Sequence, residues 1–105
     1  MAQNYAILVL PSKANTPSIS SNATALAVNG ERSAWSIQNL GQNTLYVLLG
    51  SGATSSVFHF ALKAGTSNDD GTGGSVAQES GSVYTGIITI AGSSPRYTVT
   101  ELGTL

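Results

Sequence analysis

The sequence predicts an all-β protein, an antiparallel β-sandwich of jelly-roll-like architecture that forms a single domain over residues 1–105. Short segments rich in β-branched, aromatic and aliphatic residues recur along the chain, and clusters of Gly, Asn and Ser separate them. No segment keeps the apolar period of a helix. The length of 105 residues is typical of one domain.

The first strand is expected over residues 5–10, which are apolar at both sets of alternating positions and end at Pro11. Such a strand is normally covered on both faces. Residues 11–24 are rich in Ser, Pro, Asn and Thr, and Pro11 and Pro17 argue against a regular central strand. We expect residues 11–24 to form an extended contact arm or, alternatively, a plain surface loop.

The next two strands are expected to form a hairpin. Residues 25–28 and 32–39 flank Asn29-Gly30, which is the strongest two-residue hairpin signal. In the second of these strands Trp35 and Ile37 share one face, so both are expected to point into the core. The alternative for Trp35 is a platform on which a sugar ring stacks.

Two central strands follow. Residues 44–49 are apolar on both faces, so their second face is expected to lie under another sheet or in a subunit interface. Residues 57–62 form the next predicted strand, with two phenylalanines and Leu62 on one face and His59 on the other.

The last third of the chain is expected to contain a long loop and a closing hairpin. Residues 63–82 hold five of the twelve glycines and few apolar residues, which predicts a Gly-rich loop. Residues 84–91 and 96–102 are then expected to pair around the turn at 92–95.

Composition excludes several classes of function. Charged residues make up 9% of the chain, against about 25% in ordinary soluble domains, and the net charge is −1. The sequence therefore offers no electrostatic field for nucleic acid or an anionic membrane. A neutral, hydroxyl-rich surface suits packing against protein, because a buried unpaired charge is costly. Cysteine is absent, and no signal peptide or membrane-spanning run is recognised.

No motif predicts an enzyme, a cofactor or a metal site. Residues from Asn68 to Glu79 match part of the EF-hand spacing, but the flanks are strand-like and the first position lacks its carboxylate. A solvated acidic loop is expected there, with a bound cation as the alternative. His59 is the single histidine, and no Gly-x-Ser-x-Gly elbow accompanies it.

The chain resembles the small all-β head proteins of tailed bacteriophages, the capsid decoration or cement proteins. The resemblance covers roughly two-thirds of the chain. It is carried by IQNLG at 37–41, LYV at 45–47 with Gly50, FHFAL at 58–62 with Ala64-Gly65, YTGII at 84–88 and YTVTE at 97–101.

This resemblance implies a structural virion protein made in the host cytoplasm and bound to the outer capsid surface. Its partners would be the phage major capsid protein and further copies of itself, as a homotrimer in preference to a dimer. The alternatives are a tail, baseplate or fibre module, or a carbohydrate-binding module using Tyr46, Tyr84 or Tyr97. The candidate interface residues are Tyr5, Ile7, Val9, Tyr46, Leu48, His59, Asn15, Ser18 and Ser20.

Overall fold

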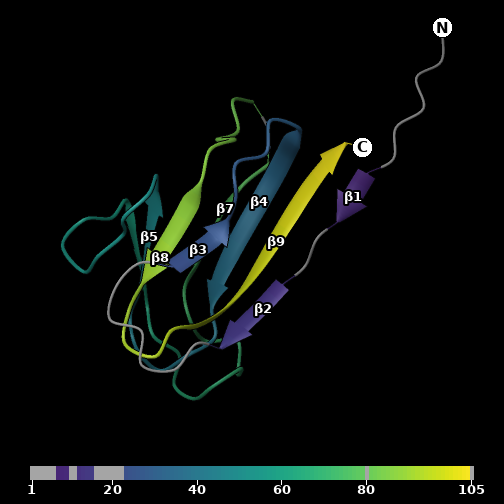
Figure 1. Cartoon of the computed structure of the whole chain (residues 1–105). Coiled ribbons are helices and arrows are strands. Elements are labelled where there is room, and N and C mark those ends of the chain that lie inside the picture. Colours follow the sequence, from purple (N-terminus) through teal and green to yellow (C-terminus); the bar gives the residue numbers. More distant parts are fainter. Residues whose placement is uncertain (1–6, 10–11, 16–22, 80, 105) are drawn as a thin grey trace, which may run out of the picture.

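The computed structural model describes residues 7–9, 12–15, 23–79 and 81–104, and within this part of the chain every regular element is a β-strand (Figure 1). The strands are β1 (Ile7–Val9), β2 (Ser12–Asn15), β3 (Ala23–Leu26), β4 (Arg32–Asn39), β5 (Leu45–Leu49), β6 (Phe60–Leu62), β7 (Ser75–Gln78), β8 (Ile88–Ala91) and β9 (Arg96–Thr104). No helix long and apolar enough to cross a membrane occurs among these residues.

The strands form two antiparallel sheets that pack face to face. One sheet has the order β1-β9-β4-β7, with β2 also paired to β9, and the other has the order β3-β8-β5-β6. Because β1 and β2 lie in line along β9, they act as one interrupted strand. The chain changes sheet between most consecutive strands, and this alternation is the topology of a jelly roll. The predicted all-β, jelly-roll-like sandwich is confirmed.

The interrupted strand corrects part of the N-terminal prediction. Residues 7–9 pair with the end of β9, as Ile7 opposite Thr104, and β2 continues the same register with Ser12 opposite Val99. The segment 11–24 therefore contains an edge strand where a loop or arm was expected. A proline is compatible with such a position, because an edge strand needs backbone donors on one side only.

Both predicted hairpins are wrong. Asn29 and Gly30 do lie in a turn, in which the Arg32 amide donates to the Asn29 carbonyl at 3.1 Å. However, β3 pairs with β8 while β4 pairs with β7 and β9, so this turn connects the two sheets. The turn at 92–95 likewise joins β8 and β9, which belong to different sheets.

Several strand boundaries also differ from expectation. β3 spans Ala23–Leu26 where a strand over 25–28 was expected, and β8 begins at Ile88 where a strand from residue 84 was expected. The Gly-rich segment 63–82 contains β7, whose Val76 is half-buried and lies opposite Ile37. This segment has few apolar residues, but it can still form a strand because its backbone hydrogen-bonds to β4. The strand expected over 57–62 begins only at Phe60, and residues 57 and 58 belong to the preceding loop.

The core lies between the two sheets and consists of inward-facing side chains from both. Trp35 is 3% exposed and Ile37 is fully buried, so the prediction that both point into the core is confirmed. The remaining buried members of the cluster are Leu26, Leu45, Val47, Leu62, Ile88, Ile90, Tyr97 and Val99.

One end of the core is closed by a buried amide. The Asn39 side chain donates to the carbonyls of Asn43, Leu62 and Lys63, at 2.8 to 3.2 Å, and accepts from the Gly41 amide at 2.9 Å. Asn39 is 1% exposed, and its amide satisfies backbone groups of the loop between β4 and β5 and of the end of β6.

Candidate protein-binding surface

The outer face of the β3-β8-β5-β6 sheet carries an apolar surface on β5. Leu45 and Val47 are buried in the core, and the alternate residues Tyr46 and Leu48 point outward and are half-buried. Tyr46 lies opposite Ala61 of β6 and Ala91 of β8, so its neighbours on this face are small. The second apolar face of β5 therefore points away from the other sheet. Such an orientation is the one that a subunit interface would require.

A loop of the same chain covers the β8 side of this face. Residues 50–59 connect β5 to β6, and Ala53 in this loop is fully buried. The Ala53 amide donates to Oγ1 of Thr89 at 3.2 Å, and that hydroxyl donates to the Gly50 carbonyl at 2.7 Å. Thr89 is consequently 2% exposed, so part of the outer face is covered without any partner.

The same loop holds two apolar side chains in solvent. Val57 is 52% exposed and Phe58 is 39% exposed. Thr54 and Val57 exchange two backbone hydrogen bonds, of 3.0 and 3.2 Å, and Oγ1 of Thr54 accepts from the Ser56 and Val57 amides. The Phe58 ring packs against Tyr46, with ring centroids 4.8 Å apart. A hydrogen-bonded turn thus keeps an apolar pair outward, next to Tyr46.

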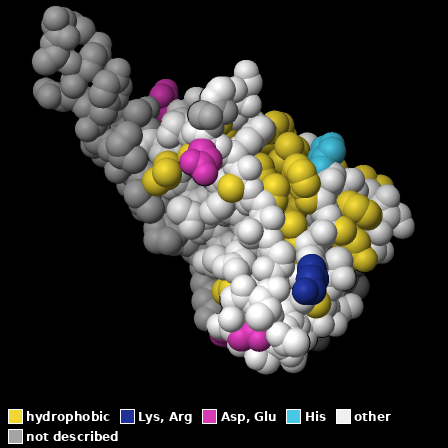
Figure 2. Space-filling view, turned by 180° about the vertical axis from the view of Figure 1, so that it is seen from behind, with side chains coloured by type: hydrophobic (Ala, Val, Ile, Leu, Met, Phe, Trp, Pro, Cys, Tyr) yellow, Lys and Arg dark blue, Asp and Glu magenta, His cyan; other side chains and the backbone are white. Residues whose placement is uncertain are grey.

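His59 anchors the end of this loop to the sheet. Its amide donates to the Val47 carbonyl at 2.7 Å, and its Nδ1 accepts from the Leu49 amide at 3.0 Å. These two hydrogen bonds hold the imidazole against the end of β5, at the border of the apolar surface. Figure 2 shows hydrophobic side chains gathered beside the histidine on this side of the molecule. We call Tyr46, Leu48, Val57 and Phe58 the apolar patch.

The candidate interface residues that the structure describes fall into two groups. Tyr46, Leu48 and His59 come together at the apolar patch. Ile7 and Val9 lie in β1 and Asn15 lies in β2, on the far edge of the other sheet. Tyr5, Ser18 and Ser20 are outside the described residues. Sequence reasoning missed Val57 and Phe58 as surface residues, because it placed both in the strand expected over 57–62, which begins only at Phe60.

A hollow lies on the outer face of the opposite sheet. It measures about 460 Å³ and is lined by Ser33, Ala34, Trp35, Ser36, Ala77, Glu79, Thr100 and Leu102. Ser36 is the cross-strand neighbour of both Ala77 and Thr100, so small side chains form its middle. Trp35 contributes only a small exposed part, because it is 3% exposed and its Nε1 donates to Gln78 at 3.0 Å.

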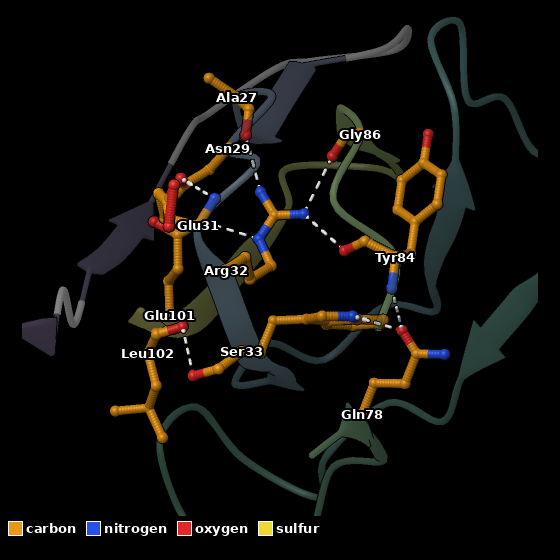
Figure 3. Close-up of polar contacts among 11 residues, drawn as sticks. Ala27, Asn29, Glu31, Arg32, Ser33, Gln78, Tyr84, Gly86, Glu101 and Leu102 are labelled. Carbon is orange, nitrogen blue, oxygen red and sulfur yellow. Dashed lines mark hydrogen bonds and ion pairs between the residues drawn. The ribbon is translucent and has the colours of Figure 1, made fainter. Parts of the chain in front are cut away.

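On the core side of the sandwich, a buried arginine of β4 joins the two sheets (Figure 3). Arg32 Nε donates to Oε2 of Glu101 at 2.7 Å, and both side chains are buried. Its remaining nitrogens donate to the carbonyls of Ala27, Tyr84 and Gly86, at 2.7 to 3.0 Å. Arg32 thus fixes the segments that follow β3 and precede β8, which is a structural role.

The sequence analysis did not single out Arg32. A signal was present, because Glu101 alternates in phase with Tyr97 and Val99 and so had to face inward with them. A carboxylate on a core face requires a partner.

The acidic loop is closed by its own hydrogen bonds. Asp70 Oδ1 accepts from the amide and hydroxyl of Thr72 at 2.9 and 2.6 Å, and Oδ2 accepts from Thr66 and Ser67. The Thr72 hydroxyl is the main reason why the pKa of Asp70 lies well below its usual range. Asp69 forms an ion pair with Arg96. Within the described part of the chain, no group of three or more His, Cys, Asp or Glu residues could hold a metal ion.

No protein-family model matches the chain, and comparisons with curated proteins and with solved structures found no match either.

Proposed function

We propose that the chain is a non-enzymatic structural protein that works as an oligomer and decorates the outer surface of a phage head. The observation that carries the structural role is the apolar patch. A hydrogen-bonded turn holds Val57 and Phe58 outward against Tyr46, although their burial would be favourable. Exposed apolar surface held in this way is typical of protein–protein interfaces.

The head as the site of action is an expectation from the resemblance to decoration proteins. Low charge supports it, because docking on another protein desolvates few charged groups of this chain. In this role the protein bridges neighbouring major capsid subunits across a seam. An oligomer gains from several weak contacts at once, because each bound copy raises the effective concentration of the next.

The direct test is co-sedimentation of the purified protein with phage heads that lack it. We expect saturable binding and heads that resist heat or osmotic shock better once decorated. Absence of binding to heads, with the protein itself folded, would contradict the capsid role. Binding to purified tails or baseplates alone would favour the tail-module alternative.

A second test concerns the contact arm expected over residues 11–24. Within it, β2 occupies Ser12–Asn15 and β3 begins at Ala23, and residues 16–22 lie outside the described residues. We expect a variant with a shortened 16–22 segment to keep its fold and to bind heads more weakly. A replacement of the same residues by an equally long Gly/Ser segment is the matched control for chain length. Wild-type occupancy by both variants would contradict a contact role for this segment.

A further inference from the structure

Two charged side chains stand out among those that the structure describes, because the others are paired. Of the charged residues whose side chains are described, Arg32, Glu101, Arg96 and the two aspartates all make hydrogen bonds or ion pairs, and Glu31 also has a partner. Lys63 and Glu79 are the two for which the structure shows no side-chain partner. They have opposite signs, and both are exposed.

Lys63 lies on the same outer face as the apolar patch. It follows β6, in which Ala61 faces outward opposite Tyr46 and Leu62 faces the core. Alternation along the strand places Lys63 on the same side as Ala61. This outer face therefore carries an apolar protrusion, Val57 and Phe58, and one positive charge.

Glu79 lies on the other sheet, at the rim of the hollow of about 460 Å³. It is two residues beyond Ala77, so it points to the same outer face. The hollow complements the apolar patch in shape and Lys63 in charge. Ala34, Ala77 and Leu102 supply apolar surface for an inserted side chain, and Glu79 supplies one negative charge.

We propose that copies of this chain associate head to tail. Val57 and Phe58 of one copy insert into the hollow of the next copy, and Lys63 pairs with Glu79 across the contact. The association is head to tail because the two surfaces lie on opposite sheets, whereas a two-fold interface would use one patch twice. Repetition of such a contact closes a ring when the rotation between copies allows it.

The proposal specifies the oligomeric part of the proposed function and does not depend on head binding. Its experiments use the purified protein alone, so that failure here and failure of head decoration are distinguishable. An oligomer that does not bind heads would contradict only the capsid role, and a monomer that binds heads would contradict only the contact described here.

The first experiment is a charge exchange measured by sedimentation velocity at about 100 μM. Wild type is expected to be oligomeric. Lys63→Glu or Glu79→Lys alone should weaken association by about tenfold or more, because each juxtaposes like charges. The double variant should recover most of the wild-type association. Asn68→Lys, at an exposed loop residue outside both surfaces, is the charge control and should have no effect.

Several outcomes of this experiment would overturn the proposal. These are a monomeric wild type, single variants that associate like wild type, and a double variant as weak as either single one. Thermal melts of all variants check that the fold is kept, which is expected because both residues are exposed.

The second experiment uses the absence of cysteine from the chain, which leaves no background thiol. Protein with Lys63→Cys is mixed with protein with Glu79→Cys under mild oxidation. Disulfide-linked dimers that contain one copy of each variant are expected. Dimers of Lys63→Cys with itself as the main product would instead indicate two-fold packing of the apolar patches and would overturn the head-to-tail contact.

Discussion

Arg32 and Glu101 form an ion pair inside the sandwich. Nε of Arg32 lies 2.7 Å from Oε2 of Glu101, and the two side chains are 0% and 8% exposed. The pair connects β4 to β9 within one sheet, and the same guanidinium binds carbonyls of the segments that lead into the other sheet. One side chain therefore connects three parts of the chain that are far apart in sequence, residues 27–32, residues 84–86 and Glu101.

Arg32→Met is expected to lower the free energy of unfolding by about 3–5 kcal/mol, because it leaves the buried Glu101 carboxylate without a partner. Urea unfolding at pH 7 measures this effect. Arg96→Met is the matched control, since the Arg96–Asp69 pair is partly exposed and its loss should lower the free energy of unfolding much less. Equal effects of the two substitutions would contradict a special role for the buried pair.

Replacement of Trp35 should destabilise the protein severely. Trp35→Ala removes a large side chain from the core and should cost about 3–5 kcal/mol. Trp35→Phe keeps part of the packing but loses the hydrogen bond from Nε1 to Gln78, so an intermediate loss is expected. Thermal melts test both variants. A Trp35→Ala variant that melts like wild type would mean that this side chain contributes little to the core.

Asp70 should titrate at unusually low pH. Its pKa is lowered mainly by the hydrogen bond from the Thr72 hydroxyl, so Thr72→Val should raise the pKa toward the ordinary value of about 3.9. Carboxyl chemical shifts in an NMR titration give the pKa directly. A wild-type Asp70 that titrates near its ordinary value would contradict the hydrogen-bonded loop.

The same lowered pKa predicts a pH dependence of stability. Because the folded-state pKa is below the unfolded-state value, the contribution of Asp70 is present above about pH 4 and is lost as the pH falls through the folded-state pKa. Asp70→Asn should therefore make the decline in stability below about pH 4 less steep. Denaturant midpoints between pH 2 and pH 7 test this, and an unchanged slope would contradict it.

Gly73 should not tolerate a side chain. A Cβ there would overlap the backbone carbonyl of Asn39, which cannot move because Asn39 is buried at the end of β4. Gly73→Ala is expected to cost about 1–3 kcal/mol or more. Gly30→Ala is the matched control, because a Cβ at Gly30 meets nothing within 4 Å. Similar melting temperatures for the two variants would refute the steric argument.

The sequence by itself determined the fold class and the local faces of the best strands. Alternation placed Trp35 and Ile37 in the core and put Tyr46 on the opposite face from Leu45 and Val47, because strand geometry sends successive side chains to opposite faces whatever the partner strand is. Turn chemistry at Asn29-Gly30 was also recognised correctly as a turn. These features depend on neighbours in sequence, so local reasoning reaches them.

The tertiary structure decided which strands pair. Both expected hairpins failed because a turn does not specify whether the following strand stays in the same sheet or crosses to the other. In a jelly roll most pairings join residues distant in sequence, such as Trp35 with Glu101. Exposure of Val57 and Phe58, and the juxtaposition of Arg32 with Glu101, follow from these long-range pairings and from the path of the loops. They depend on where segments meet in space, which local periodicity does not encode.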